Sequence, residues 1–194
     1  GHMNSITSSF SFPTSHMGVS SLVRAVKVLY GDHPTLPSVS VYFQGCDAFP
    51  KCHGCHNPET WDFDENFVVG FEHLETLTTQ KISFLLSRFE KVGLALLGGE
   101  PLSERNRYAA YLLAKRIKER VNKQVTVIVY TWRLPEDLEK IDIPLMYFDE
   151  FVMGRYIKEY HQDGFPASRN QLYITYDELC SRFNVCSMSE RVSE

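Results

Sequence analysis

Two stretches near the start of the chain alternate hydrophobic with polar residues. One covers residues 26–30 and stops at the turn Gly31-Asp32-His33-Pro34, and the other covers residues 38–44 and stops at Gly45. Successive side chains of a strand point to opposite faces of its sheet, so a spacing of two predicts a β-strand in each stretch. The first cysteine of the chain, Cys46, therefore follows the C-terminal end of a predicted strand.

From Thr79 onward the spacing of the apolar residues changes to that of a helix. A period of about 3.6 residues gathers apolar side chains on one helical face, and Gly93 is the expected stop. A second helical pattern follows Ser103, whose hydroxyl is suited to cap a helix. The predicted buried faces consist of Ile82, Leu85, Leu86 and Phe89 in the first helix and of Ala109, Leu112, Leu113 and Ile117 in the second.

Short apolar runs between and after these helices predict further strands. Strands that alternate with helices predict an α/β fold with a parallel sheet, in which ligands bind at the C-terminal ends of the strands. We expect one core domain over residues 21–176, preceded by a tag remnant and flexible segment over 1–20 and followed by an appendage over 177–194. The further strands are predicted at residues 94–97, 125–130, 147–152 and 172–174, with a short proline-led helix at 135–140.

Composition narrows the class of protein. The chain is 43% hydrophobic and 23% charged, which is typical of a folded domain. Its net charge is -4 and it has no run of basic residues, so nucleic acid is not the expected partner. No apolar stretch approaches the ~20 residues that cross a bilayer, and residues 4–20 lack a signal-peptide pattern, so we expect a cytoplasmic protein with no membrane partner.

Three cysteines lie within one predicted loop. Cys46, Cys52 and Cys55 occur close together in a chain whose five cysteines are an odd number, which does not favour a disulfide scaffold. Three thiolates suit a four-iron cluster with one iron left open, or a zinc ion completed by His53 or His56. Free thiols without a metal are the third interpretation, which the close spacing does not favour.

A glycine-rich turn is predicted at the same edge of the sheet. Residues 98–101, Gly-Gly-Glu-Pro, follow a predicted strand and precede a predicted helix. Such a turn is by itself only a strand-to-helix connection, but beside three cysteines it becomes a candidate ligand site. Cys180 and Cys186 cannot complete a four-thiolate site between them, so they stay unassigned.

Several motifs, in this order and spacing, resemble a known family. Cys-x-Gly-Cys-x-Asn at residues 52–57, followed by Thr60-Trp61 and by Gly-Gly-Glu-Pro-Leu at 98–102, is similar to the small radical S-adenosylmethionine activases of anaerobic ribonucleotide reductases. Three later stretches agree with the same family: Val129-Tyr130-Thr131-Trp132, Val152-Met153-Gly154-Arg155 and Ser168-Arg169-Asn170-Gln171. The landmarks span most of the chain, from Leu22 to Ile174.

The resemblance implies a fold and a set of ligands. The implied fold is a partial (β/α)6-type radical SAM barrel with parallel strands. Cys46, Cys52 and Cys55 would hold three irons of a 4Fe-4S cluster, whose fourth iron would take the amino and carboxylate groups of S-adenosylmethionine. The implied contacts to this cofactor are Gly98, Gly99 and Glu100 around its methionyl part, with Asn57, Tyr130 and Arg155 as further candidates.

The resemblance also implies an activity and its partners. Members of the family cleave S-adenosylmethionine reductively and place a radical on a glycine of the large anaerobic ribonucleotide reductase chain. They take the electron from a donor such as flavodoxin. Two other classes stay open: a radical S-adenosylmethionine enzyme acting on a small molecule or peptide, and a zinc-binding interaction module.

Three departures from the family pattern lie near the expected cofactor. Five residues separate Cys46 from Cys52, where the family has three. The turn before the second strand is Tyr30-Gly31-Asp32-His33-Pro34 in place of Asn-Gly-Pro-Gly, and Met153-Gly154-Arg155 replaces Asp-Gly-Lys. These changes leave the cluster interpretation intact but bear on the partner and on some cofactor contacts.

Overall fold

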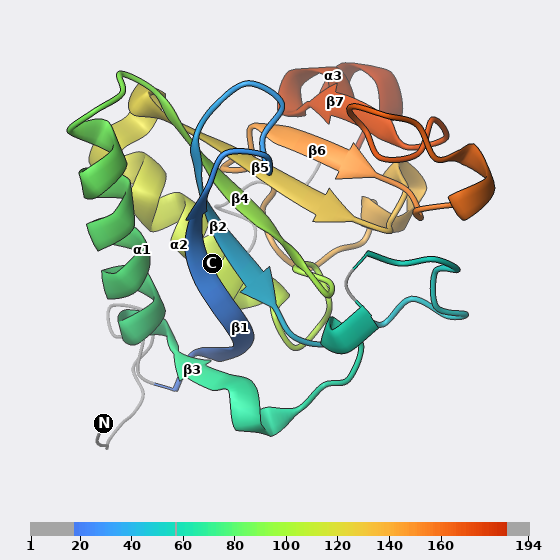
Figure 1. The fold of residues 1–194 in the computed structure, drawn as a ribbon, viewed down its shortest axis with the longest axis horizontal. Coiled ribbons are helices and arrows are strands. Elements are labelled where there is room, and N and C mark those ends of the chain that lie inside the picture. Colours follow the sequence, from blue (N-terminus) through green and yellow to red (C-terminus); the bar gives the residue numbers. More distant parts are fainter. Residues whose placement is uncertain (1–17, 57, 186–194) are drawn as a thin grey trace.

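The computed structural model describes residues 18–56 and 58–185, which form a seven-stranded sheet with its main helices on one face (Figure 1). The strands are β1 (Ser20–Leu29), β2 (Ser38–Phe43), β3 (Val68–Gly70), β4 (Val92–Gly98), β5 (Val125–Thr131), β6 (Glu150–Met153) and β7 (Leu172–Thr175). The α-helices are α1 (Phe71–Leu86), α2 (Arg107–Val121) and α3 (Tyr176–Phe183). Short 3-10 helices are η1 (Pro58–Thr60), η2 (Glu65–Phe67), η3 (Asn122–Gln124), η4 (Pro135–Leu138) and η5 (Lys158–Tyr160).

The sheet is mixed and open. Its strand order is β3-β1-β2-β4-β5-β6-β7, in which β2, β4, β5 and β6 run parallel. The other pairs, β1 with β2, β1 with β3 and β6 with β7, are antiparallel. The α/β class with parallel strands is therefore confirmed. The sheet also contains antiparallel pairs, which the alternation of strands and helices does not predict, and it is not closed: β3 and β7 form its two edges.

Connection length explains the antiparallel pairing of β1 with β2. Parallel neighbours need a crossover of a dozen or more residues, whereas antiparallel neighbours can be joined by a short turn. Only residues 30–37 join β1 to β2, which pair with Val28 opposite Val39. The crossovers from β2 to β4 and from β4 to β5 contain α1 and α2, respectively, so these strands run parallel.

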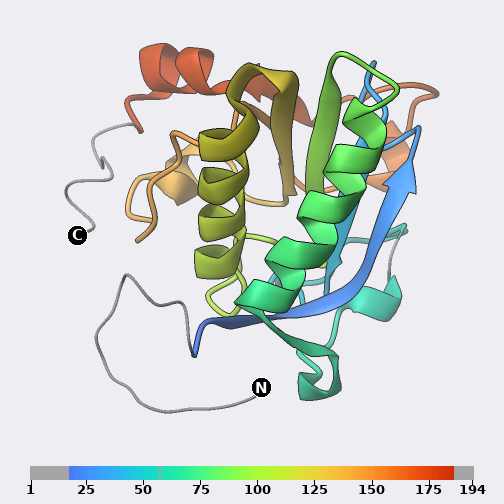
Figure 2. The same cartoon turned by 90° about the vertical axis from the view of Figure 1, so that its left-hand side faces the viewer.

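The hydrophobic core lies between the sheet and the helices α1 and α2 (Figure 2). Val39, Val41 and Phe43 of β2 are fully buried and face this layer, as their alternation predicts. All four predicted core residues of the second helix are buried, as are Ile82 and Leu85 of the first. The helix-covered face of the sheet is therefore the one that the apolar pattern identifies.

Two helix predictions need correction. The first helix begins at Phe71, well before Thr79, and ends at Leu86, so Phe89 lies beyond it and is 39% exposed. The second helix begins at Arg107 with Asn106 at its N-cap, whereas Ser103 is buried in the preceding turn, where its carbonyl accepts from the amide of Asn106. In both cases the turn geometry, which spacing does not encode, sets the helix end.

The other face of the sheet carries a smaller apolar cluster of Ala95, Ile128 and Val152. The β1–β2 connection folds against polar side chains on this face. Asp32 accepts hydrogen bonds from the Tyr42 hydroxyl at its carboxylate and from the Tyr130 hydroxyl at its carbonyl, both at 2.6 Å. The family's Asn-Gly-Pro-Gly turn is thus replaced by a connection that is tied to two strands.

The C-terminal part of the described chain packs on the domain. Thr175 and Glu178 form a capping box at the start of α3, and Leu179 and Val185 join the main core. Residues 177–185 of the predicted appendage therefore contact the core, while residues 1–17 of the predicted flexible segment lie outside the described residues, as does Cys186.

Cys180 is disulfide-bonded. Within residues 18–56 and 58–185, none of the helices is long and apolar enough to cross a membrane.

Candidate metal centre and cofactor site

The C-terminal ends of the four parallel strands bring the predicted site residues to one edge of the sheet (Figure 1). β2 leads into the segment 46–56, called here the cysteine loop, and β4 leads into the turn of Gly98, Gly99 and Glu100. β5 leads into residues 132–134, and β6 leads into Gly154 and Arg155. This edge is where ligands bind to open α/β sheets.

The glycine turn lies in close contact with the start of the cysteine loop. A Cβ on Gly99 would lie 2.4 Å from the Gly45 oxygen and 2.8 Å from the Thr60 oxygen. Gly98 has φ +108°, and a Cβ there would lie 2.6 Å from the Phe43 nitrogen. Only glycine allows this approach of two backbones, and the approach is fixed by a hydrogen bond of 2.7 Å from the Glu100 amide to the Gly45 carbonyl.

Cys46 is held by its backbone and half-buried. Its amide donates to the Trp61 carbonyl at 2.9 Å, and the amide of Gly45 donates to the Thr60 carbonyl at 2.7 Å. Burial raises the pKa of the Cys46 thiol to about 11, and the nearby Glu100 adds to that rise. Iron binding at Cys46 would therefore release a proton, because a thiolate is the metal ligand.

Cys52 and Cys55 lie on the outer part of the same loop. Both are half-buried and neither forms a disulfide, and the Cys55 amide donates to the Cys52 carbonyl at 3.2 Å, which closes a short turn. The exposed His56 packs its ring against Tyr156, with ring centroids 4.5 Å apart. His56, one of the two histidines considered as a fourth zinc ligand, thus has an aromatic contact in this structure.

The donor set of the loop fits a four-iron cluster. Three cysteines on one loop, none of them in a disulfide, match three irons of such a cluster, and the fourth iron then stays open for another ligand. Within the described residues, no three His, Cys, Asp or Glu side chains lie close enough together to hold a single metal ion.

Glu100 is enclosed at the ends of β4 and β5. Its side chain is 1% exposed, and Thr131 donates its hydroxyl to Oε2 at 2.7 Å while the Trp132 amide donates to Oε1 at 3.0 Å. The Leu102 amide donates to Oε2 at 3.0 Å, and Arg133 lies 3.4 Å from the same oxygen. Burial raises the pKa of Glu100 to about 7, although Arg133 and the hydrogen bonds oppose that rise.

Asp47 and Arg133 form an ion pair that the sequence analysis missed. Arg133 donates to the two carboxylate oxygens of Asp47 at 3.1 and 2.6 Å, and the Trp132 indole donates to Oδ1 at 2.8 Å. Burial alone would raise the pKa of Asp47, but the hydrogen bonds from Arg133 and Trp132 outweigh it and lower the pKa. The available signals were an acidic residue directly after Cys46 and an arginine after a strand that ends at the same edge.

The three weaker cofactor candidates occupy different places. The Tyr130 hydroxyl donates to the Asp32 carbonyl at 2.6 Å, on the sheet face away from α1 and α2. Arg155 donates to the carbonyls of Phe49 and Pro50 in the cysteine loop, at 2.9 Å for Phe49. Asn57 lies outside the described residues. The structure thus brings Arg155 to the loop, and a role of these three residues toward S-adenosylmethionine stays a prediction.

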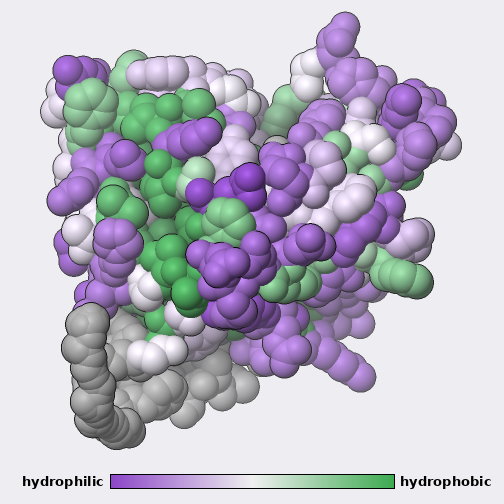
Figure 3. Space-filling model, turned by 60° about the horizontal axis from the view of Figure 1, so that its bottom comes forward, coloured by the Kyte–Doolittle hydropathy of each residue, from purple (hydrophilic) through white to green (hydrophobic). Residues whose placement is uncertain are grey.

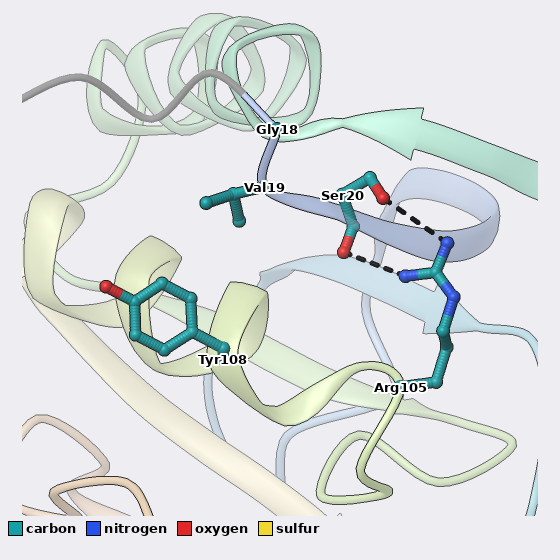
Figure 4. Close-up of a pocket in the computed structure, with 5 residues that line it drawn as sticks. All are labelled: Gly18, Val19, Ser20, Arg105 and Tyr108. Carbon is teal, nitrogen blue, oxygen red and sulfur yellow. Dashed lines mark hydrogen bonds between the residues drawn. The ribbon is translucent and has the colours of Figure 1, made fainter. Parts of the chain in front are cut away.

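A separate hollow lies between the start of β1 and the first turn of α2 (Figure 4). It is lined by Gly18, Val19, Ser20, Arg105 and Tyr108, and it contains none of the cysteines. Arg105 already donates to the carbonyl and hydroxyl of Ser20 at 3.0 and 3.3 Å. Figure 3, a view of the face that is turned forward from the bottom of Figure 1, shows a group of apolar side chains among mostly hydrophilic ones.

A match to a protein-family model identifies the class to which this protein belongs. The family described as 4Fe-4S single cluster domain matches residues 37–174, which include the cysteine loop and the glycine turn. The fold and the three-thiol loop therefore belong to a protein of the single-cluster iron–sulfur class.

The relatives identify the particular family. The chain is 28% identical over 138 residues to the anaerobic ribonucleoside-triphosphate reductase-activating protein of Vibrio cholerae, covering 69% of this chain and 84% of the relative. It is 31% identical over 120 residues to the protein of that name from Enterobacteria phage T4, covering 62% and 71%. It is 25% identical over 122 residues to the one from Haemophilus influenzae, covering 62% and 74%. The chain belongs to the family of anaerobic ribonucleoside-triphosphate reductase-activating proteins.

Proposed function

We propose that this chain is an activase that cleaves S-adenosylmethionine reductively and generates a glycyl radical on the large chain of an anaerobic ribonucleotide reductase. The observation that carries the proposal is a loop with three cysteines that follows β2 and whose start, at Gly45, is bonded to the Gly98–Glu100 turn at the ligand-binding edge of the sheet, in a member of this family. The names of the relatives support the partner. An electron donor such as flavodoxin and a cytoplasmic site complete the proposal, because the three loop cysteines must stay reduced to bind iron, and the disulfide-bonded Cys180 lies outside that loop.

The chain's own residues would prepare the cofactors in three ways. Cys46, Cys52 and Cys55 would hold three irons and leave the fourth iron for the amino and carboxylate groups of S-adenosylmethionine. When bound, the cluster supplies the electron for cleavage of the carbon–sulfur bond. Gly98 and Gly99 would contact the methionyl part through their backbone, while their lack of a side chain lets the turn pack against the backbone of Phe43 and Gly45. The turn itself is fixed against the Gly45 carbonyl, so it is ordered before the cofactor arrives.

Glu100 would supply the negative charge that faces the methionyl ammonium. Its carboxylate is already oriented by Thr131, Trp132 and Leu102, which fix it at the strand ends. We expect Glu100→Gln to weaken S-adenosylmethionine binding by about 10-fold to 150-fold, the loss of one charge-assisted hydrogen bond of ~1.5 to 3 kcal/mol. Calorimetric titration of the reconstituted variant tests this, and wild-type affinity with a full cluster would refute the role.

The cluster assignment is tested by removing each thiol. We expect Cys46→Ala, Cys52→Ala and Cys55→Ala each to abolish iron retention after anaerobic reconstitution, because the loop holds no spare thiol. Cys180→Ala and Cys186→Ala are the control variants and should keep the brown colour and about four irons per chain. Unchanged iron in all three loop variants would refute the assignment, and a colourless zinc protein would support the interaction module instead.

The substrate is tested with the partner present. Reduced protein alone should cleave S-adenosylmethionine slowly, whereas addition of the anaerobic reductase of the same organism should give a glycyl-type doublet in electron paramagnetic resonance, located on the larger chain. A small metabolite or peptide that sharply accelerates cleavage and is itself altered, without any doublet, would favour the second class of enzyme.

A further inference from the structure

The first half of the cysteine loop is held by side chains from the segments that directly follow β5 and β6. Five residues separate Cys46 from Cys52, two more than in the family pattern. Of these five, Asp47 is bound through its carboxylate by Arg133 and Trp132, and Ala48 is 1% exposed. The next two, Phe49 and Pro50, have their carbonyls bound by Arg155. The longer spacer is therefore attached to the domain at successive positions.

The three attaching side chains form one unit, which we call the clamp: Trp132, Arg133 and Arg155. The Arg133 and Arg155 guanidiniums lie 4.7 and 5.2 Å from the centre of the Trp132 indole, so each supports the same ring. Nη1 of Arg133, which donates to Asp47, also lies 3.4 Å from the buried Glu100 carboxylate. The clamp thus connects the cysteine loop to the turn that carries Glu100.

We infer that Asp47 and the clamp are positioning residues that hold the lengthened loop so that Cys46 and Cys52 can bind one cluster. This inference rests on the cluster assignment of the proposed function. A longer spacer has more conformations to lose when its ends are brought together. Bidentate binding of Asp47 by an arginine that is itself 8% exposed removes many of those conformations before iron binds. The carbonyls held by Arg155 restrict the following two residues.

The test compares two aspartates that each pair with an arginine. Asp47→Ala removes the loop attachment but leaves Arg133 beside Glu100, so it is preferred to a change of Arg133 itself. Asp142→Ala is the matched control, because Asp142 accepts from Arg107 at 2.9 Å outside the cysteine loop. Asp47→Asn is the conservative variant, since its amide oxygen still accepts from the guanidinium or the indole. Arg155→Ala tests the second attachment independently.

Two measurements decide the outcome. In reconstituted protein, the first-order rate of iron release to a chelator should rise about 10-fold to 100-fold in Asp47→Ala, as for other residues that support metal ligands. Asp47→Asn should release iron more slowly than Asp47→Ala and should keep more of the paramagnetic resonance signal of the reduced cluster. Asp142→Ala should match the wild type in both measurements. In iron-free protein, deuterium uptake of peptides within residues 46–56 should be faster in Asp47→Ala and in Arg155→Ala than in the wild type.

The same measurements can overturn the inference. Equal iron release and equal deuterium uptake in Asp47→Ala and Asp142→Ala would show that the clamp does not position the loop. If the wild type itself bound no iron, the proposed function would fail, while the exchange measurement on iron-free protein would still decide whether Asp47 and the clamp order the loop. If Asp47→Ala did not fold, Asp47→Asn and Arg155→Ala would carry both measurements.

Discussion

The two halves of the candidate site differ in how the protein holds them. The Gly98–Glu100 turn is enclosed, and the carboxylate of Glu100 is bonded by Leu102, Thr131 and Trp132. The cysteine loop is half-exposed beyond Cys46, with Phe49 90% exposed at its outer side. The fold alone therefore shapes the turn, whereas the outer loop depends on a few side-chain attachments and on what it binds.

This difference separates two kinds of site residue. Substitution of a residue in the turn should lower the free energy of unfolding of the iron-free domain, because the backbone and the charge of the turn are buried where water cannot solvate them. A residue of the outer loop should affect iron and leave the iron-free domain nearly unchanged. Substitutions in the turn and in the outer loop should therefore differ in how much they change the free energy of unfolding.

The largest effect is expected from Gly99→Ala. The new Cβ would lie 2.4 Å from the Gly45 carbonyl oxygen and 2.8 Å from the Thr60 oxygen, both backbone atoms that cannot rotate away. We expect a loss of about 3 kcal/mol or more in the free energy of unfolding of the iron-free protein, measured by denaturant titration.

Gly31→Ala is the matched control, because a Cβ at Gly31 would meet nothing within 4 Å. It should change the free energy of unfolding by less than about 0.5 kcal/mol. Equal effects of the two substitutions would mean that the turn and the start of the cysteine loop are not in close contact.

A smaller change in the free energy of unfolding, one that depends on pH, is expected from Glu100→Gln. Its pKa is raised to about 7 in the folded chain from an ordinary 4.5, mainly by burial. The native chain therefore binds more protons than the unfolded chain between those values, so this group's contribution is fully present below the lower value and is lost as pH rises through the higher one. Between about pH 5 and pH 8 the wild type should lose ~1 to 3 kcal/mol more than Glu100→Gln does.

Glu65→Gln serves as the control for the pH measurement. Glu65 is an exposed carboxylate whose pKa is lowered by its hydrogen bond with Arg105, so its titration lies below the window of interest. It should leave the pH profile of unfolding between pH 5 and 8 unchanged. A Glu100→Gln profile parallel to that of the wild type would show that Glu100 stays ionised throughout.

Much of the fold could be predicted from the sequence, since burial and spacing are linked along a single element. The alternation of Val39, Val41 and Phe43 identifies the buried face of β2, and the spacing of Leu112, Leu113 and Ile117 that of α2. Phe89 fits the helical spacing equally well but lies after the turn at Ser87, where the chain has left the helix. A pattern of spacing predicts a face and says little about where the helix stops.

The site could be predicted only where its residues form a motif. The cysteines and the glycine turn are recognisable because short spacings express their chemistry. The pairing of Asp47 with Arg133 joins residues that are 86 positions apart, and only the parallel order of β2, β4 and β5 brings them together. The edges of the sheet were mispredicted for a related reason, because strand direction depends on how the connections run in space.

The smallest change in the free energy of unfolding is expected from Cys52→Ala, although this substitution should remove all bound iron. Its half-buried side chain lies on the outer loop, so Cys52→Ala removes little buried apolar area and should change the free energy of unfolding of the iron-free protein by less than about 0.5 kcal/mol. Val41→Ala in the core, fully buried on β2, should cost several times more by the same denaturant titration. A loss at Cys52 as large as that at Val41 would mean that the outer loop is as much part of the folded core as the Gly98–Glu100 turn, and the two halves of the site would then not differ as described. A near-zero change together with complete loss of iron would place Cys52 among the residues that serve the ligand and not the fold.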